Sequence, residues 1–152
     1  WASNEGQSDY FATTKCLRKF MENDNNAAIV ADMEIPELVT KTCNEKFSSE
    51  AEVLVCQRSG MAGLSLGNLF RALRNLTTEL KFDTPDTNVV STTNHNHPEP
   101  QCRLDTYWNG ALCDVDAYTD VGDDSYATGT CTRVDGYDSG VRPLCWFKAP
   151  RN

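Results

Sequence analysis

The sequence lacks both a long apolar run and a cluster of basic residues. Its longest apolar-rich stretches, 53–55 and 61–70, are far shorter than the roughly 20 residues that a membrane-spanning helix needs. The chain has 14 Lys and Arg against 22 Asp and Glu, so its formal net charge is −8. Because a phosphate backbone requires a basic surface, we exclude nucleic acid as a partner, and the short apolar runs exclude a membrane span.

Cys-x-x-Cys pairs are also absent, although the chain has seven cysteines. Structural zinc sites and thioredoxin-like proteins use such pairs, whereas widely spaced cysteines favour disulfides in an oxidising compartment. We therefore expect a secreted or periplasmic protein. Many connectivities are open to six cysteines, and the simplest one joins nearest neighbours, which leaves Cys16 free or bonded to another segment. These pairs are Cys43 with Cys56, Cys102 with Cys113, and Cys131 with Cys145.

The length and composition favour one globular domain with its own core, since 39% of the 152 residues are apolar. We predict an α+β fold, in which a mainly helical first two thirds with four helices is followed by a disulfide-rich tail of short strands and turns. The predicted division is a helical part over 1–90, a loop over 91–101 and a stapled tail over 102–152 that packs on the helical part. The tail prediction follows from its glycines, aromatics and cysteines.

Four helices are predicted from apolar spacing and end signals. The first covers 3–21, with Ser3 or Asn4 as its cap, and a short second helix covers 27–33 before Pro36 interrupts. Ser49 to Glu52 has the spacing of a capping box and opens a third helix, for which Gly60 is the predicted end.

The fourth predicted helix, over 61–80, carries one continuous apolar stripe. We expect this stripe to be buried against the first helix, because an apolar face must be buried to offset the ordering entropy of the chain. The residues expected at this contact are Leu17, Phe20, Leu69, Phe70 and Leu73.

Two carboxylates lie one helical turn apart near the start of the chain. Glu5 and Asp9 share a helix face, which Ala12 and Cys16 continue. A solvated face is the ordinary interpretation of such a pair. The small residues that follow instead indicate a buried face, and a buried carboxylate pair needs a cation.

These residues resemble part of a known family. The run Glu5-Gly6-Gln7-Ser8-Asp9, followed by Ala12, is similar to the third-ligand helix of the gluzincin zinc metallopeptidases, the class that includes thermolysin. By this resemblance Glu5 would be a zinc ligand, and Asp9 would orient a ligating histidine by accepting its second ring N–H.

A second segment resembles the same family. His97-Pro98, followed by Arg103, is similar to a His-Pro segment with a downstream arginine that follows the third-ligand helix in some small gluzincins. The resemblance implies that His97 lies near the reaction centre and that Arg103 anchors the loop against a carboxylate. The alternative is that His95 and His97 belong to a solvated turn. The two matches cover a small part of the chain.

The sequence departs from the family in one essential respect. It has no His-Glu-x-x-His, and its two histidines follow Glu5, whereas the family places its metal-binding pair earlier. We therefore expect the C-terminal portion of a secreted zinc metallopeptidase that acts on a peptide or protein. It would be inactive alone and would share zinc with a His-Glu-x-x-His segment, for which Cys16 is a candidate link.

An acidic loop and several aromatic residues support other interpretations. Asp114, Asp116 and Asp120 alternate in a glycine-containing loop, as calcium ligands do, although Ser125 stands where an EF-hand has its closing glutamate. A solvated acidic loop is the alternative to calcium. The rival function is a self-contained secreted, disulfide-rich binding or inhibitor-like module, which would use this acidic surface and its aromatics for recognition. The aromatics are Tyr107, Trp108 and Tyr118.

Overall fold

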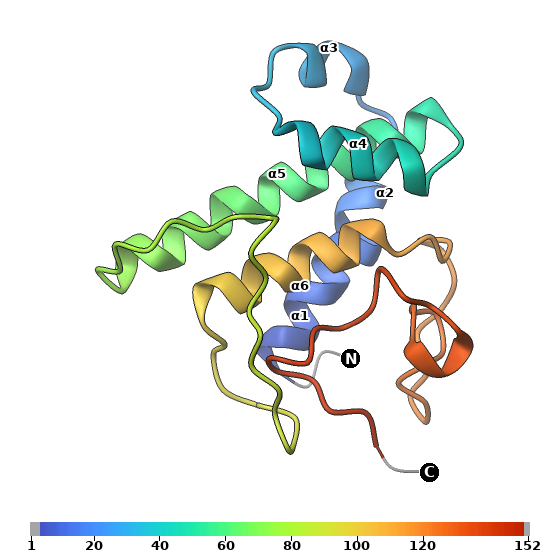
Figure 1. Ribbon diagram of the computed structural model, residues 1–152. Coiled ribbons are helices and arrows are strands. Elements are labelled where there is room, and N and C mark those ends of the chain that lie inside the picture. Colours follow the sequence, from blue (N-terminus) through green and yellow to red (C-terminus); the bar gives the residue numbers. More distant parts are fainter. Residues whose placement is uncertain (1–3, 151–152) are drawn as a thin grey trace.

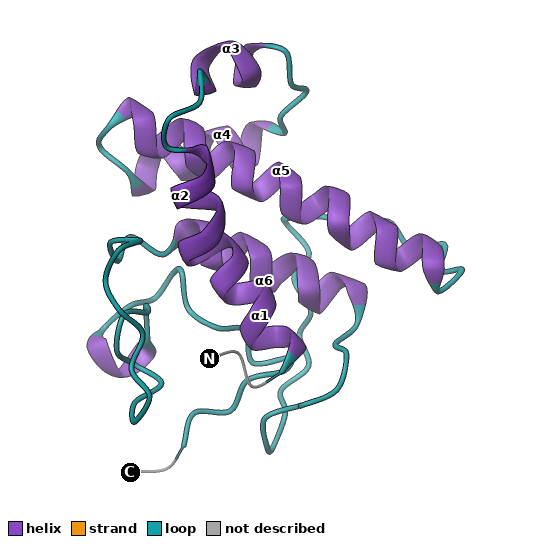
Figure 2. Ribbon diagram, turned by 180° about the vertical axis from the view of Figure 1, so that it is seen from behind, coloured by secondary structure: helices purple, strands orange, loops and turns teal. Residues whose placement is uncertain are grey.

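The computed structural model describes residues 4–150, which form helices joined by loops (Figure 1). This range contains no strand (Figure 2), so the predicted tail of short strands is wrong, whereas the mainly helical first part is confirmed. After 112 the described chain forms loops and one short 3-10 turn, η2 (Arg133–Asp135). No helix among the described residues is long and apolar enough to cross a membrane.

The predicted first helix is present and contains a wide π-helical turn. Its three parts follow one another without a break: α1 (Glu5–Phe11), η1 (Ala12–Cys16) and α2 (Leu17–Met21). Asn4 caps the start, because its side chain accepts a hydrogen bond of 2.8 Å from the backbone N–H of Gln7. The predicted cap at Ser3 lies outside the described residues.

Two short helices follow. The predicted second helix is confirmed as α3 (Asn26–Ala31), and α4 (Glu37–Lys46) was not predicted. α4 begins directly after Pro36, which the sequence indicated only as an interruption. A proline at a helix start costs little, because the first N–H groups of a helix have no partner within the helix.

One long helix replaces the predicted third and fourth helices. α5 (Glu50–Leu73) begins at the predicted cap Ser49 and continues through Gly60, where an end was predicted. Gly63 shows why the helix continues: a Cβ there would lie 2.5 Å from the Cβ of Tyr107. The glycines thus let the backbone of α5 approach its neighbour closely, and this packing outweighs their helix cost of about 1 kcal/mol each.

The predicted leucine contact between the first helix and 61–80 is wrong. Leu73 is 69% exposed and Phe20 is 79% exposed, and Leu66 and Leu69 are exposed as well. The C-terminal half of α5 projects from the body (Figures 1 and 2), and its glycine face is the buried one.

The central helix of the fold is α6 (Pro100–Leu112), which lies where the sequence predicted the start of the tail. It contacts α5, α1 and η1. Its first residue is a proline, which suits a helix start. Almost every side chain of α6 is buried, so this helix lies between the other helices and the tail (Figure 1).

The disulfides tie the tail to both ends of α6. Cys43–Cys56 is confirmed, but the other two pairs are Cys102–Cys145 and Cys113–Cys131, with Cα–Cα distances of 6.0 and 5.6 Å. The predicted bond between Cys102 and Cys113 is wrong for a geometric reason. Cys102 lies in the first turn of α6 and Cys113 directly follows its last residue. The helix rise of about 1.5 Å per residue therefore separates them far beyond the roughly 7 Å that a disulfide can span.

The core has two parts. One lies between α4, α5 and α6, and the other surrounds the disulfides of the tail and the start of the chain. The first contains Val39, Cys43, Phe47, Val53, Cys56, Trp108, Ala111 and Leu112. The second contains Tyr10, Cys102, Cys113, Cys131, Val141, Cys145 and Trp146. Because α6 contributes to both parts, it connects the helical layer to the tail.

Candidate functional site

A cluster of four polar side chains joins α1 to α6. The Nε of Arg103 donates to one oxygen of Asp9 and its Nη2 to the other, both at 2.7 Å. The same Nη2 lies 3.1 Å from Oε2 of Glu5. The hydroxyl of Tyr107 donates to Oδ1 of Asp9 at 2.6 Å. We call Glu5, Asp9, Arg103 and Tyr107 the Arg103 cluster.

The two helices position the cluster through their periodicity. Glu5 and Asp9 are one turn apart on α1, and Arg103 and Tyr107 are one turn apart on α6, so each pair lies on one helix face. Because these faces meet, the carboxylates lie against the guanidinium and the phenol. Phe70 of α5 covers the guanidinium, with its ring centre 3.7 Å from the central carbon of Arg103.

Burial strengthens these contacts. Asp9 and Arg103 are each 5% exposed, whereas the side chain of Glu5 is 41% exposed. Burial raises the pKa of the Tyr107 hydroxyl, and the hydrogen bond to Asp9 raises it further. Burial lowers the pKa of Arg103, but the hydrogen bond and charge of Asp9 outweigh it and raise that pKa overall. The phenol therefore stays a neutral donor and the guanidinium stays a cation.

Arg103 is the cation that the carboxylate pair requires. From its position on α6 it binds both carboxylates, so it joins two helices, and its predicted role as an anchor of the loop that carries His97 stays a prediction. Asp9 accepts three hydrogen bonds, which leaves about one of its four acceptor positions open. For Glu5 only Oε2 has a partner among the described residues. Within the cluster, Glu5 is thus the residue best able to offer an oxygen to a metal.

We call the loop that carries His95 and His97 the His95 loop, and it lies beside the start of α1. The side-chain nitrogen of Asn4 is 3.2 Å from Nδ1 of His95. At the other end of the loop, Arg74 donates to the carbonyl oxygen of Pro98 at 3.4 Å. His97 is exposed and makes no hydrogen bond with the described residues. Its catalytic role stays a prediction.

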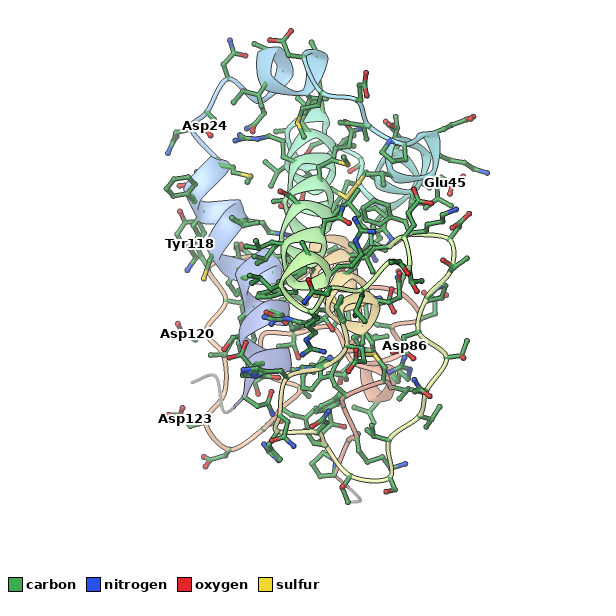
Figure 3. All side chains as sticks on the ribbon, turned by 90° about the vertical axis from the view of Figure 1, so that its left-hand side faces the viewer. Asp24, Glu45, Asp86, Tyr118, Asp120 and Asp123 are labelled. Atoms are coloured by element: carbon green, nitrogen blue, oxygen red, sulfur yellow. A yellow bond between two sulfur atoms is a disulfide. The ribbon has the colours of Figure 1, made fainter. Side chains whose placement is uncertain are left out.

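Two of the three acidic residues proposed for calcium have partners of their own. Asp114 pairs with Lys46 at 2.8 Å, and Oδ1 of Asp116 accepts a hydrogen bond of 2.7 Å from the N–H of Tyr118. Tyr118, Asp120 and Asp123 lie on the side of α1 and α2, across the molecule from Asp86 (Figure 3). No contact in the described chain decides between calcium and a solvated loop, so calcium stays a prediction.

Three possible metal-ligand atoms come within 4.8 Å of one another at Asp86, Cys102 and Cys145. Cys102 and Cys145 are bonded to each other, so neither has a thiolate to offer. This group is therefore not a metal centre while the disulfide is intact.

An acidic concavity lies between α2, α5 and the segment after α6. It has a volume of about 370 Å³, and its acidic lining residues are Glu22, Glu52, Asp114 and Asp116. Arg18 lies among them and donates to the carbonyl oxygens of Ala111 and Cys113. Burial lowers the pKa of Arg18.

One aromatic residue accompanies this acidic lining. Tyr118 is exposed and lines the cavity, whereas Tyr107 and Trp108 are buried. The three therefore do not form the common aromatic surface that the sequence suggested.

Two contacts of the cluster were not predicted: Tyr107 is a partner of Asp9, and Phe70 covers Arg103. The signal for Tyr107 was present, because Arg103 and Tyr107 have the same four-residue spacing as Glu5 and Asp9. That spacing has meaning only on a helix, and α6 was predicted as strands and turns. Phe70 gave no such signal, since its stripe was expected to pack against the first helix.

Comparison of the chain with protein-family models, with curated proteins and with solved structures found no match.

Proposed function

We propose that the chain is the C-terminal portion of a secreted zinc metallopeptidase, in which Glu5 is one zinc ligand. A His-Glu-x-x-His segment outside these 152 residues would supply the two histidine ligands and the general base. One observation carries the proposal. Arg103 binds Glu5 and also Asp9, which is 94 residues away, and the His95 loop contacts Asn4, so the two segments that the sequence singled out lie against α1.

The residues of the cluster fit a zinc site in distinct ways. Glu5 has an oxygen without a partner and a half-exposed side chain, so it can reach a metal at the surface of α1. Arg103 holds both carboxylates in place. Asp9 retains about one acceptor position, which suits the ring N–H of a ligating histidine. A bound zinc would supply Lewis acidity and an activated water.

The covalent structure supports the compartment in this proposal. Three disulfides persist in an oxidising environment such as the periplasm or the extracellular space. Cys16 is unpaired and exposed. In the proposal, its thiol is a candidate for a bond to the segment that carries His-Glu-x-x-His.

Peptide hydrolysis by the chain joined to its His-Glu-x-x-His segment tests the proposal. Glu5→Gln removes the charged ligand and should abolish hydrolysis, because zinc needs three protein ligands. Glu50→Gln is the matched control, since Glu50 is an exposed glutamate in the first turn of α5. Hydrolysis that is unchanged in Glu5→Gln would exclude the proposed role of Glu5.

A second candidate function, the self-contained binding module, is favoured by the acidic cavity. Four carboxylates, one arginine and Tyr118 around about 370 Å³ suit the basic side chain of a peptide or protein. Calorimetric titration of the 152-residue chain with an arginine-containing peptide tests this function. Binding that Glu52→Gln weakens and Glu50→Gln leaves unchanged would support it, and the absence of binding would exclude it.

A further inference from the structure

Arg142 is a buried cation without an anionic partner among the described residues. It is 2% exposed, and no carboxylate of residues 4–150 forms an ion pair with it. Its Nε donates to Oε1 of Gln7 at 2.8 Å, and its Nη1 donates to the carbonyl oxygen of Tyr126 at 3.1 Å. Its Nη2 is buried and has no hydrogen-bond partner. The side chain thus lacks both a neutralising charge and one acceptor.

The surroundings of Arg142 compensate its charge only in part. Three aromatic rings surround the guanidinium, with centres 4.7 Å (Tyr10), 5.7 Å (Phe11) and 5.1 Å (Phe147) from its central carbon. Such contacts offset only part of the cost of burying an ion. Burial lowers the pKa of Arg142 to about 10, so the group is still a cation at neutral pH. An anion nearby would stabilise it.

A small pocket beside Arg142 has the size and the lining for such an anion. Its volume of about 30 Å³ is enough for one or two water molecules. No acidic side chain lines it. The amide oxygen of Gln7 is occupied by Arg142, so its NH₂ group is free to donate. The hydroxyl oxygen of Ser125 accepts a hydrogen bond from the N–H of Ala127, which leaves its O–H free. Thr128 adds a second hydroxyl to the lining.

We propose that this pocket binds a small monovalent anion, chloride under ordinary conditions, through the charge of Arg142 and the donors of Gln7, Ser125 and Thr128. The pocket is too small for a tetrahedral oxyanion. A larger pocket of about 140 Å³ also contacts Arg142, and its lining includes Arg133 and Lys148. Sulfate or phosphate would bind there instead, so the size of the anion separates the two pockets.

The function of this anion is structural. Arg142 connects the tail to α1 through Gln7 and to the loop before η2 through Tyr126. An anion that neutralises the charge of Arg142 should therefore stabilise the contact between the tail and the first helix. This inference does not depend on the zinc proposal, because Arg142 belongs to neither the Arg103 cluster nor the His95 loop.

Thermal unfolding of the 152-residue chain in sodium chloride and in sodium gluconate of equal ionic strength tests the proposal. Chloride should raise Tm, and the rise should grow with chloride concentration, because a ligand of the folded state stabilises it. Thr128→Val, which keeps the shape but removes a donor, should reduce the chloride-dependent rise. Arg142→Gln should abolish it. Arg133→Gln is the control and should keep it, because Arg133 lines only the larger pocket.

A crystal soaked in sodium bromide gives the independent structural test. An anomalous peak within hydrogen-bond distance of Arg142 and Thr128 is the expected result. Equal Tm in chloride and gluconate, together with no such peak, would overturn the proposal. Stabilisation by sulfate that is lost in Arg133→Gln would also overturn it, because it would assign the anion to the larger pocket. If Arg142→Gln does not fold, Thr128→Val and the bromide peak decide the question.

Discussion

The carboxylate of Asp9 and the guanidinium of Arg103 are 94 residues apart in sequence and form two parallel hydrogen bonds of 2.7 Å. This two-pronged geometry is the most favourable that arginine and a carboxylate can adopt, and it fixes the orientation of both groups. Because one group lies on α1 and the other on α6, the pair sets the register between these helices. It also holds the turn of α1 that carries Glu5.

Breaking this pair should destabilise the fold strongly. Arg103→Gln would leave Asp9 as a buried charge without a counter-ion, which costs roughly 3–5 kcal/mol. Denaturant unfolding measures the loss, and Lys41→Gln is the control, because Lys41 pairs with Glu45 in an exposed position and should cost below about 1 kcal/mol. The double variant Asp9→Asn with Arg103→Gln should recover part of the loss. If Arg103→Gln and Lys41→Gln lost equally little free energy of unfolding, the assigned role of the pair would be contradicted.

Asp105 should make the stability depend on pH. Burial raises its pKa from 3.8 to about 6, against the hydrogen bonds from the N–H of Asp86 and the amide of Gln101. The folded protein therefore binds a proton more tightly than the unfolded chain. The corresponding stability is fully present below about pH 4 and is lost as the pH rises through about 6, by roughly 3 kcal/mol.

Asp105→Asn removes this titration. The free energy of unfolding of the variant, relative to that of the original protein, should therefore rise between pH 4 and pH 7. Chemical unfolding at a series of pH values measures the difference. Parallel pH profiles for the two proteins would show that Asp105 titrates normally.

Substitutions on the two faces of α5 should differ in how much they destabilise the fold. Leu73→Ala should change the free energy of unfolding by less than about 0.5 kcal/mol, since Leu73 is mostly exposed. Gly63→Ala should cost roughly 1–3 kcal/mol, because the new methyl group would overlap Tyr107. Denaturant melts of both variants provide the comparison. A large loss for Leu73→Ala and none for Gly63→Ala would mean that the leucine face is the buried one.

The disulfides should contribute according to the length of chain that they enclose. Replacing Cys102 and Cys145 by serine removes a disulfide that joins residues 43 positions apart, and it should cost about 4 kcal/mol of stability. Replacing Cys43 and Cys56, which are 13 positions apart, should cost about 3 kcal/mol. Thermal unfolding gives both values. Peptide mapping without reduction should find Cys102 linked to Cys145, and a peptide that links Cys102 to Cys113 would refute the arrangement of the tail.

Local signals in the sequence predicted the first helix, α3 and the start of α5 correctly. Caps at Asn4 and Ser49 act on neighbouring residues, so they can be recognised without knowledge of the fold. The continuation of α5 through Gly60 depends on contacts with Trp108 and Tyr107 of α6, a helix that is distant in sequence. No local pattern contains that contact, and the leucine stripe suggested the opposite face.

The candidate site was predictable in part. The need of Glu5 and Asp9 for a cation follows from their spacing, and Arg103 was singled out separately. The contact between them could not be derived, because it requires that 100–112 form a helix. The burial of Arg142 without a carboxylate partner in residues 4–150 could not be derived either, since it results from the way the tail folds back on α1.

The zinc content of the chain joined to its His-Glu-x-x-His segment is the most direct test of Glu5 as a metal ligand. After removal of unbound metal, elemental mass spectrometry should find about one zinc per molecule in the original protein and in Glu50→Gln, and almost none in Glu5→Gln. Asp9→Asn should retain zinc with about 10- to 100-fold weaker affinity. One zinc per molecule in Glu5→Gln, bound as tightly as in the original protein, would contradict the account.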